Sequence, residues 1–175
     1  YELEQLAYPL NGPPKERRGD IPMVLLQKVK LTNLQNAPRT LAVSMIHRRQ
    51  FRPHFDSSLE VKRQNQSTLF QEASQGRALF TVQGGYADLQ WTGVRDYQQE
   101  QKRVDAVVFM DLPASGTREF VVKLPSALVE PEDQEKLLSL PYDTARAETL
   151  RFWSEYVTKG AQFRVPEKVV NDLFS

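Results

Sequence analysis

The chain lacks cysteine altogether, which excludes a disulfide framework and thiolate chemistry. It also lacks an excess of charge, because 23 lysines and arginines stand against 22 aspartates and glutamates, for a net charge of +1. Nucleic-acid binders gather a basic excess on one face, so no nucleic-acid partner is expected. No apolar run is long enough to cross a bilayer and no signal peptide is visible, so no membrane partner is expected. With 175 residues, the chain is long enough for one domain with a substantial core.

Histidine is scarce as well, since the sequence holds only His47 and His54. On one continuous strand, residues seven apart point to opposite faces, and Pro53 interrupts such a strand. His54 and Asp56 can share a face, but two ligands do not hold a metal tightly. We therefore expect no metal and no cofactor, and we interpret both histidines as surface residues.

Catalytic motifs are also missing, and no Gly-x-Ser-x-Gly nucleophile motif occurs. Glycoside hydrolysis usually needs two carboxyl groups about 5–5.5 Å or about 6.5–9.5 Å apart. Asp105 and Asp111 lie on one expected strand, separated by roughly 20 Å at about 3.3 Å per residue, which is too far. We therefore assign no catalytic residue, and we do not expect this segment alone to be an enzyme.

What the sequence does contain is β-structure over most of its length. Period-two alternation of apolar and polar residues predicts strands in nine segments, namely 2–7, 23–32, 39–46, 60–63, 68–70, 77–82, 87–91, 104–112 and 118–124. Turn residues at 33–38, Gly84-Gly85 and 113–117 predict hairpins, and 96–103 is expected to be a polar loop. This pattern predicts an all-β fold, an antiparallel β-sandwich of the supersandwich type over residues 1–140.

A change of period marks the last part of the chain. Apolar residues from Ala145 onward recur at three- and four-residue steps, which predicts an amphipathic helix over 143–159. One face of this helix carries Phe152, Trp153, Tyr156 and Val157. Gly160 fits the left-handed residue that ends a helix, and Pro166 is suited to open a second helix over 167–174. Residues 141–175 are therefore interpreted as a helical linker and the start of a following helical domain.

The spacing of Phe152-Trp153, Gly160, Val165-Pro166 and the segment 171–174 resembles a known junction. It is similar to the linker helix and first barrel helix of bacterial six-hairpin glycosidases, the glycogen-debranching-like and α-L-rhamnosidase-like enzymes. The resemblance covers about the last thirty residues and implies that a large β-sandwich precedes a catalytic (α/α)₆ barrel. It also implies that the catalytic acid and base lie in that barrel, downstream of Ser175.

The resemblance implies a non-catalytic accessory domain of a glycoside hydrolase, which packs on the downstream barrel of the same polypeptide and shapes its cleft. The sandwich over 1–140 would then be a fragment of a larger one, and the helix face with Phe152, Trp153, Tyr156 and Val157 would dock on the barrel. Cysteine usage does not distinguish cytosol from periplasm, and a periplasmic or secreted bacterial location is favoured over a cytoplasmic one.

Two other functions stay open. Tyr86, Trp91 and Tyr97 are candidate aromatic contacts for an oligosaccharide, with Asp88 as a candidate polar contact, which would suit an independent carbohydrate-binding module. Alternation around Trp91 also fits an ordinary half-buried strand, and Trp91 in the core is the favoured interpretation. The remaining alternative is a structural or interaction sandwich unrelated to sugars. Exposure of the three aromatic residues distinguishes the binding module from the other two.

Overall fold

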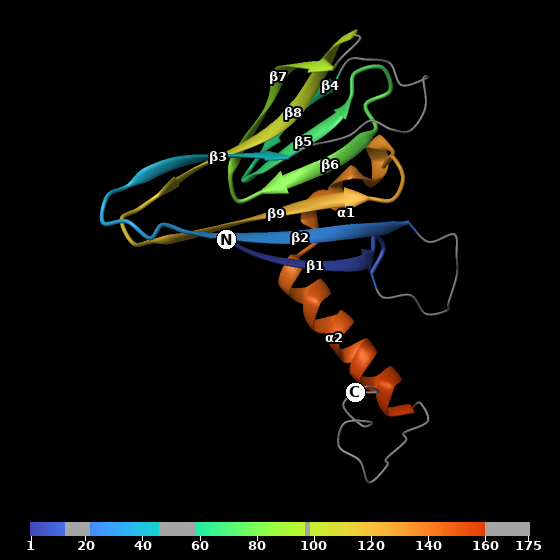
Figure 1. Ribbon diagram of the computed structural model, residues 1–175. Helices are drawn as coiled ribbons and strands as arrows, with labels where there is room; N and C mark the ends of the chain where they lie inside the picture. The colour runs from blue at the N-terminus through green and yellow to red at the C-terminus, as the bar shows by residue number, and fades with distance from the viewer. Residues whose placement is uncertain (13–21, 46–58, 97–98, 160–175) are drawn as a thin grey trace.

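The computed structural model describes residues 1–12, 22–45, 59–96 and 99–159, and for residues 45, 59, 89–96 and 99–105 it describes the backbone alone (Figure 1). The chain forms two antiparallel sheets. The larger sheet has the strand order β1 (Glu2–Pro9), β2 (Met23–Thr32), β9 (Thr117–Pro125), β6 (Ala78–Gln83), β5 (Ser67–Glu72), β4 (Leu59–Gln64). The smaller sheet has the order β3 (Arg39–Met45), β8 (Gln99–Leu112), β7 (Tyr86–Asp96). The predicted all-β antiparallel sandwich is confirmed.

Three helical elements follow the last strand. They are η1 (Pro131–Asp133), α1 (Gln134–Ser139) and α2 (Tyr142–Lys159). Pro131 occupies the first turn of η1, where its missing N–H costs nothing. The long helix predicted over 143–159 thus begins one residue earlier, at Tyr142. The second helix expected over 167–174 lies outside the described residues.

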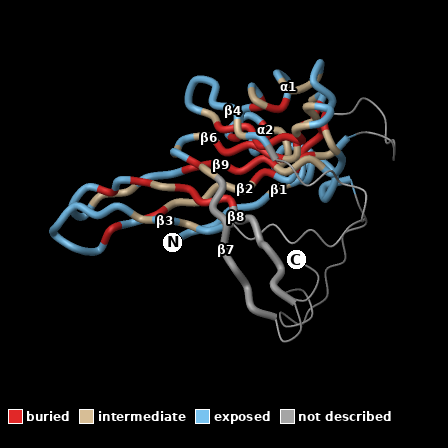
Figure 2. The backbone as a smooth tube through the Cα atoms, turned by 90° about the horizontal axis from the view of Figure 1, so that it is seen from above, coloured by how far each residue is buried: buried red, intermediate tan, exposed pale blue. Residues whose placement is uncertain are grey.

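The middle of the larger sheet is buried on both faces, which explains its apolar composition. On β2, Val29 and Leu31 belong to the core between the two sheets, whereas Val24 and Leu26 belong to a second core on the opposite face. Because side chains alternate along a strand, one strand supplies both cores. In Figure 2 buried backbone runs along β9 and β6, in the middle of this sheet.

Each core has a distinct set of partners. The inner core, between the sheets, is formed mainly by Phe70, Phe80, Val82, Val108, Met110, Leu112, Phe120 and Val122. Phe70 and Phe80 stack within it, with ring centroids 4.3 Å apart. The outer core lies under the helices and includes Val24, Leu26, Leu69, Val121, Val129, Leu137, Leu140, Tyr142 and Ala145. The start of α2 is therefore part of the packing of the sandwich.

The three predicted hairpins are wrong, although the strands that flank them exist. β2 and β3, β6 and β7, and β8 and β9 each lie in different sheets, so the segment between them crosses from one sheet to the other. At the second crossing, Gly84 has φ +91° and a Cβ there would lie 2.9 Å from the Glu119 carbonyl oxygen. A Cβ on Gly85 would lie 2.8 Å from Val108. The glycine pair therefore permits a close crossing between sheets, and not a hairpin turn.

Two of these crossings are fastened to each other by Asn33. The Asn33 side-chain nitrogen donates hydrogen bonds to the carbonyls of Ala37 (2.8 Å) and Pro113 (3.0 Å), and its backbone N–H donates to the carbonyl of Gly116 (2.9 Å). Asn33 is buried, so these bonds also satisfy polar atoms that water cannot reach. The result is a double-stranded ribbon, β2–β3 against β9–β8, that bends from the larger sheet into the smaller one.

The polar loop expected over 96–103 is also wrong. β7 runs to Asp96 and β8 begins at Gln99, so their backbones pair down to the tip of a long hairpin. Polar residues can occupy such a hairpin because its ladder satisfies the backbone without needing apolar side chains on both faces. Figure 1 shows this hairpin extending beyond the neighbouring strands of the larger sheet.

Candidate functional site

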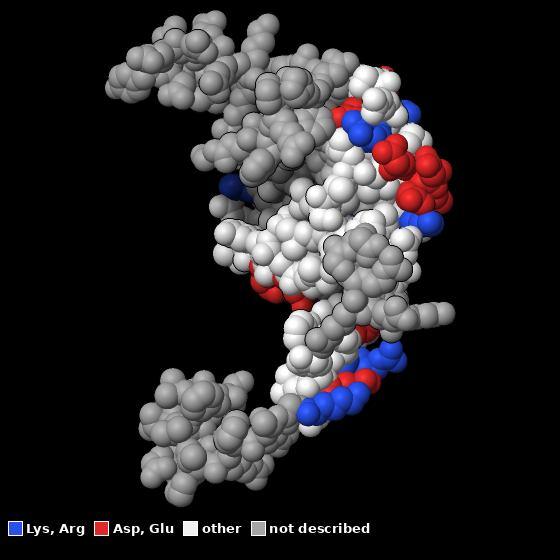
Figure 3. Space-filling model, turned by 90° about the vertical axis from the view of Figure 1, so that its right-hand side faces the viewer, with Lys and Arg blue, Asp and Glu red and all other residues white. Residues whose placement is uncertain are grey.

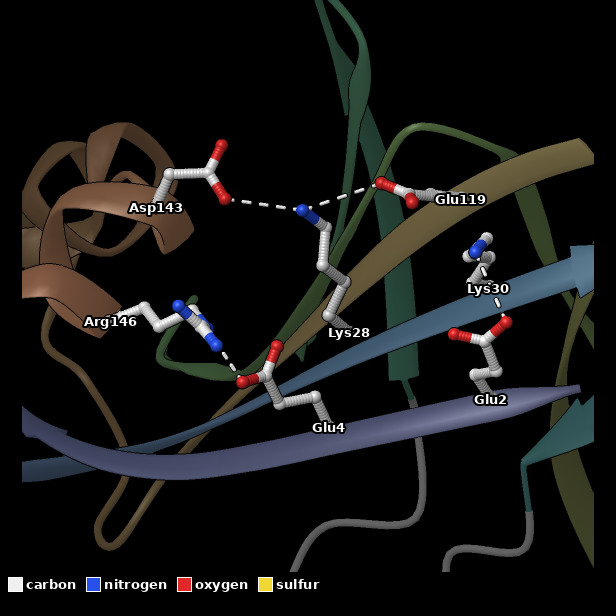
Figure 4. Close-up of polar contacts among 7 residues, drawn as sticks. All are labelled: Glu2, Glu4, Lys28, Lys30, Glu119, Asp143 and Arg146. Atoms are coloured by element: carbon white, nitrogen blue, oxygen red, sulfur yellow. Dashed lines mark hydrogen bonds and ion pairs between the residues drawn. The ribbon is translucent and has the colours of Figure 1, made fainter. Parts of the chain in front are cut away.

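The first candidate site is α2, which leaves the sandwich at an angle and projects away from it (Figure 1). Its first turn is anchored by Lys28 of β2. The Lys28 Nζ lies 3.1 Å from Asp143 and 3.3 Å from Glu119 (Figure 4). It also lies 4.9 Å from the centre of the Tyr142 ring. Burial lowers the pKa of Lys28, but the hydrogen bonds to Asp143 and Glu119 outweigh it, so the pKa is raised. Lys28 therefore stays charged and joins α2 to β2 and β9.

A second group of contacts joins the helix to the edge strand β1. Arg146 donates a hydrogen bond of 2.6 Å to Glu4, and this bond lowers the pKa of the Glu4 carboxyl (Figure 4). Tyr8 donates to the carboxylate of Glu148. Burial, together with that carboxylate, raises the pKa of Tyr8 to about 12. The first two turns of α2 are thus joined to β1 by side-chain contacts on the outer face of the larger sheet.

The second half of α2 is different, because its apolar face is exposed. Phe152, Trp153, Tyr156 and Val157, which we call the aromatic face, are 49%, 55%, 47% and 66% exposed. Their rings contact one another: Trp153 meets Phe152 and Tyr156 edge-on, with centroids 5.4 and 5.9 Å apart. The aromatic face does not pack on the described part of the sandwich. Its docking on another domain stays a prediction.

The buried residues at the beginning of α2 and the exposed aromatic residues at its end lie on one continuous stripe along the helix. Tyr142 and Ala145 are buried in the outer core, and steps of three and four residues lead from them through Thr149 to Phe152 and Tyr156. The charged residues of the second half, Arg151, Glu155 and Lys159, lie on the other side of the helix. Figure 3 shows charged side chains gathered along one side of the projecting helix. The stripe is therefore covered by the sheet at its beginning and uncovered at its end.

The second candidate site surrounds Tyr86, the first residue of β7. Tyr86 is 53% exposed, and its hydroxyl donates a 3.0 Å hydrogen bond to Asp88. Arg63 of β4 donates to both, at 3.0 Å to the Tyr86 oxygen and 3.1 Å to Asp88. The Arg63 guanidinium also lies over the Tyr86 ring, 4.7 Å from its centre, which is a cation–π contact. One face of the ring is therefore covered by arginine.

The structure brings together two of the four predicted carbohydrate contacts, Tyr86 and Asp88. The side chain of Trp91 and all of Tyr97 lie outside what is described. Arg63 is not among the predicted contacts, because it lies in a different sheet and is distant along the chain. No local signal marks it, since only the crossing at Gly84-Gly85 brings the end of β4 beside the start of β7.

Two adjoining hollows flank the turn between β4 and β5. The first, which we call the Tyr86 hollow, has a volume of about 400 Å³ and is lined by Arg63, Asn65, Gln66, Ser67, Thr68, Gly84, Gly85 and Tyr86. The second, which we call the α1 hollow, has about 370 Å³ and is lined by Gln64, Asn65, Gln66, Ser67, Gln83, Glu135, Leu138 and Ser139. Asn65, Gln66 and Ser67 line both, so the turn forms a shared wall.

A buried lysine holds α1 in place beside the second hollow. Lys123 of β9 is fully buried, and its Nζ donates to the carbonyls of Leu137 (3.1 Å) and Leu138 (2.6 Å) near the end of α1. These carbonyls carry the negative end of the helix dipole. Burial lowers the pKa of Lys123 to about 8. The amine is enclosed by the outer core and acts as a structural cap.

The described residues contain no group of three or more histidine, aspartate or glutamate side chains that could hold a metal ion. Both histidines lie outside the described residues. Among the helices that are described, none has the length and apolar character needed to span a membrane.

The fold is an all-β antiparallel sandwich with helices on the outer face of its larger sheet. Neither a family model, nor a curated protein, nor a solved structure matches this chain.

Proposed function

We propose that this chain is a non-catalytic accessory domain of a glycoside hydrolase, which docks through α2 on a helical catalytic barrel of the same polypeptide. The observation that carries the proposal is the aromatic face, three mutually contacting rings and a valine left exposed at the end of an otherwise buried stripe. The resemblance of the junction around Phe152-Trp153 and Gly160 to six-hairpin glycosidases favours that barrel as the partner.

The size of the aromatic face supports an interface. A large aromatic side chain buries about 150–250 Å² when fully covered, so three half-exposed rings leave on the order of 300 Å² of apolar surface. The largest apolar patch of a typical monomer covers about 300–600 Å² and is often functional, so a patch of this size is a candidate interaction site. A helix presents such a patch as ridges, which can interdigitate with the grooves of another helix. A helical partner therefore fits the shape as well as the chemistry.

The anchoring of α2 supports a mechanical role. Lys28 and Arg146 fix the first turns to β2 and β1, so the helix would transmit the position of the sandwich to whatever its far end contacts. A rigidly placed sandwich can form one wall of a neighbouring substrate cleft, while the acid and base are supplied by the barrel. This arrangement needs no catalytic residue in the segment itself.

The experiment compares residues 1–175 with a polypeptide that carries the native downstream sequence. Both are assayed on aryl α-rhamnosides, aryl α-glucosides and natural oligosaccharides, and we expect turnover by the longer polypeptide alone. Turnover by the shorter chain, abolished by changing one of its own aspartates or glutamates, would overturn the proposal. Docking is read separately from the Trp153 emission, obtained in each polypeptide by subtracting the spectrum of the Trp91→Phe, Trp153→Phe variant from that of the Trp91→Phe variant. Emission should shift to the blue in the longer polypeptide, and an unshifted spectrum would exclude the aromatic face as the interface.

A further inference from the structure

We propose that the Tyr86 hollow and the α1 hollow together form a binding site for a neutral oligosaccharide of two or more sugar units. The proposal does not depend on the docking of α2, since both hollows lie at the β4–β5 turn. It begins from the chemistry of the lining. Four side-chain amides and three aliphatic hydroxyl groups line the two hollows, on Gln64, Asn65, Gln66, Gln83, Ser67, Thr68 and Ser139.

Amides and hydroxyls suit sugars because each offers both a donor and an acceptor. Sugar hydroxyl groups also donate and accept, so they can pair with such a lining in many orientations. The Tyr86 ring adds apolar surface to the first hollow, against which the C–H face of a sugar can pack. Small-molecule sites combine apolar surface and a few placed polar groups in this way, in volumes of about 300–1,000 Å³.

The charges in the site select a neutral ligand. Arg63 is paired with Asp88 at 3.1 Å and held over the Tyr86 ring, so its charge is compensated within the protein. The carboxylate of Glu135 in the α1 hollow accepts a long hydrogen bond of 3.5 Å from Gln64. An anionic sugar would meet this carboxylate without an unpaired cation among the lining residues to offset it. We therefore infer a neutral saccharide, and not a sugar acid.

Backbone contacts hold the shared wall in place, which lowers the entropic cost of binding. Asn65 has φ 54°, a left-handed conformation that asparagine tolerates in tight turns. The Gln66 carbonyl accepts a 3.0 Å hydrogen bond from the backbone N–H of Gly84, which ties the turn to the crossing beside Tyr86. On the other side, Lys123 fixes α1, which carries Ser139. Two similar hollows on one fixed wall suit two adjacent sugar units.

The test titrates residues 1–175 with glucose, mannose, maltotriose, cellotriose, mannotriose and trigalacturonate, and binding is followed by protein NMR shifts. At least one neutral trisaccharide should bind in the millimolar range and at least fivefold more tightly than its monosaccharide. No saturable binding of a neutral trisaccharide, equal affinity for the monosaccharide, or tighter binding of trigalacturonate would each overturn the proposal.

Variants in each of the two hollows test which hollow binds which sugar unit. Tyr86→Ala should weaken binding of both the trisaccharide and the monosaccharide at least fivefold, and Tyr86→Phe, which keeps the ring, should weaken it less. The double variant Gln83→Ala, Ser139→Ala should reduce trisaccharide affinity to the monosaccharide level and leave the monosaccharide unchanged. Gln5→Ala, which removes an exposed amide of β1, is the matched control. Unchanged trisaccharide binding in both site variants, with the native thermal unfolding retained, would place the ligand elsewhere.

Discussion

The two halves of α2 have the same apolar stripe and opposite surroundings. In the first half, Tyr142 and Ala145 are buried, and Lys28 and Glu4 pair with the adjacent polar residues. In the second half, the rings of Phe152, Trp153 and Tyr156 contact one another and remain exposed. The difference shows that amphipathicity alone does not say what covers a helix. The covered half stabilises this domain, and the uncovered half is available to another.

The largest expected effect comes from emptying the covered half. Tyr142→Ala should lower the free energy of unfolding by about 3–5 kcal/mol, the range for removing a buried aromatic side chain. Trp153→Ala in the same 175-residue chain should change it by less than about 0.5 kcal/mol, as for an exposed position. Denaturant midpoints measure both. A loss for Trp153→Ala as large as that for Tyr142→Ala would mean that the second half is covered within this chain.

The pH dependence of stability tests the support under the covered half. Lys123 has a pKa of about 8 when folded, and an unfolded lysine titrates near 10.5. Between these values the unfolded chain binds more protons than the folded chain, so stability should rise with pH. From about pH 8 to about pH 9.5 the rise should be on the order of 2 kcal/mol. Urea unfolding at a series of pH values measures it.

Lys123→Met supplies the control for this prediction. The variant lacks the amine, so its stability should stay level over the same range, although it also leaves two carbonyls of α1 without their donor. The pKa values of Tyr8 and Tyr142 are raised to about 12, so these two tyrosines affect stability only above about pH 10. In that range the tyrosines of the unfolded chain ionise first, and stability decreases as the pH rises. A rise of equal size in Lys123→Met would contradict the assignment to this amine.

The smallest expected effect belongs to the ion pairs that orient α2. Arg146 and Glu4 are each about half exposed, so water screens their attraction. A double-mutant cycle of Arg146→Met and Glu4→Gln should give a small coupling energy that diminishes in about 1 M salt, where charges are screened within about 3 Å. The cycle Lys30→Met with Glu2→Gln, a pair between β2 and β1 that does not involve the helix, is the matched control. Coupling that is unaffected by salt would contradict the screened, exposed geometry.

Much of the fold could be predicted from the sequence, because strand alternation and helix periodicity are local properties. The strand over 23–32 and the helix from Tyr142 are examples. Which sheet a strand joins is not local, and so the glycine pair at Gly84-Gly85 predicts a hairpin that the fold does not contain. The same limitation hides Arg63, since its contact with Tyr86 depends on that crossing. Lys123 escapes prediction for another reason: only α1, packed on the outer face of β9, makes a lysine there buried.

The position of β9 has a consequence for the order in which the molecule assembles. β9 follows the other strands of the larger sheet in the sequence, yet it lies between β2 and β6 near the middle of that sheet. Its pairing with β2 joins residues that are about ninety positions apart in the sequence, and contacts of such long sequence separation form slowly. The larger sheet cannot close before β9 has been synthesised. Since the first turns of α2 dock on β1 and β2, the aromatic face is held in place only on a completed sandwich, so a partially folded chain would not present it.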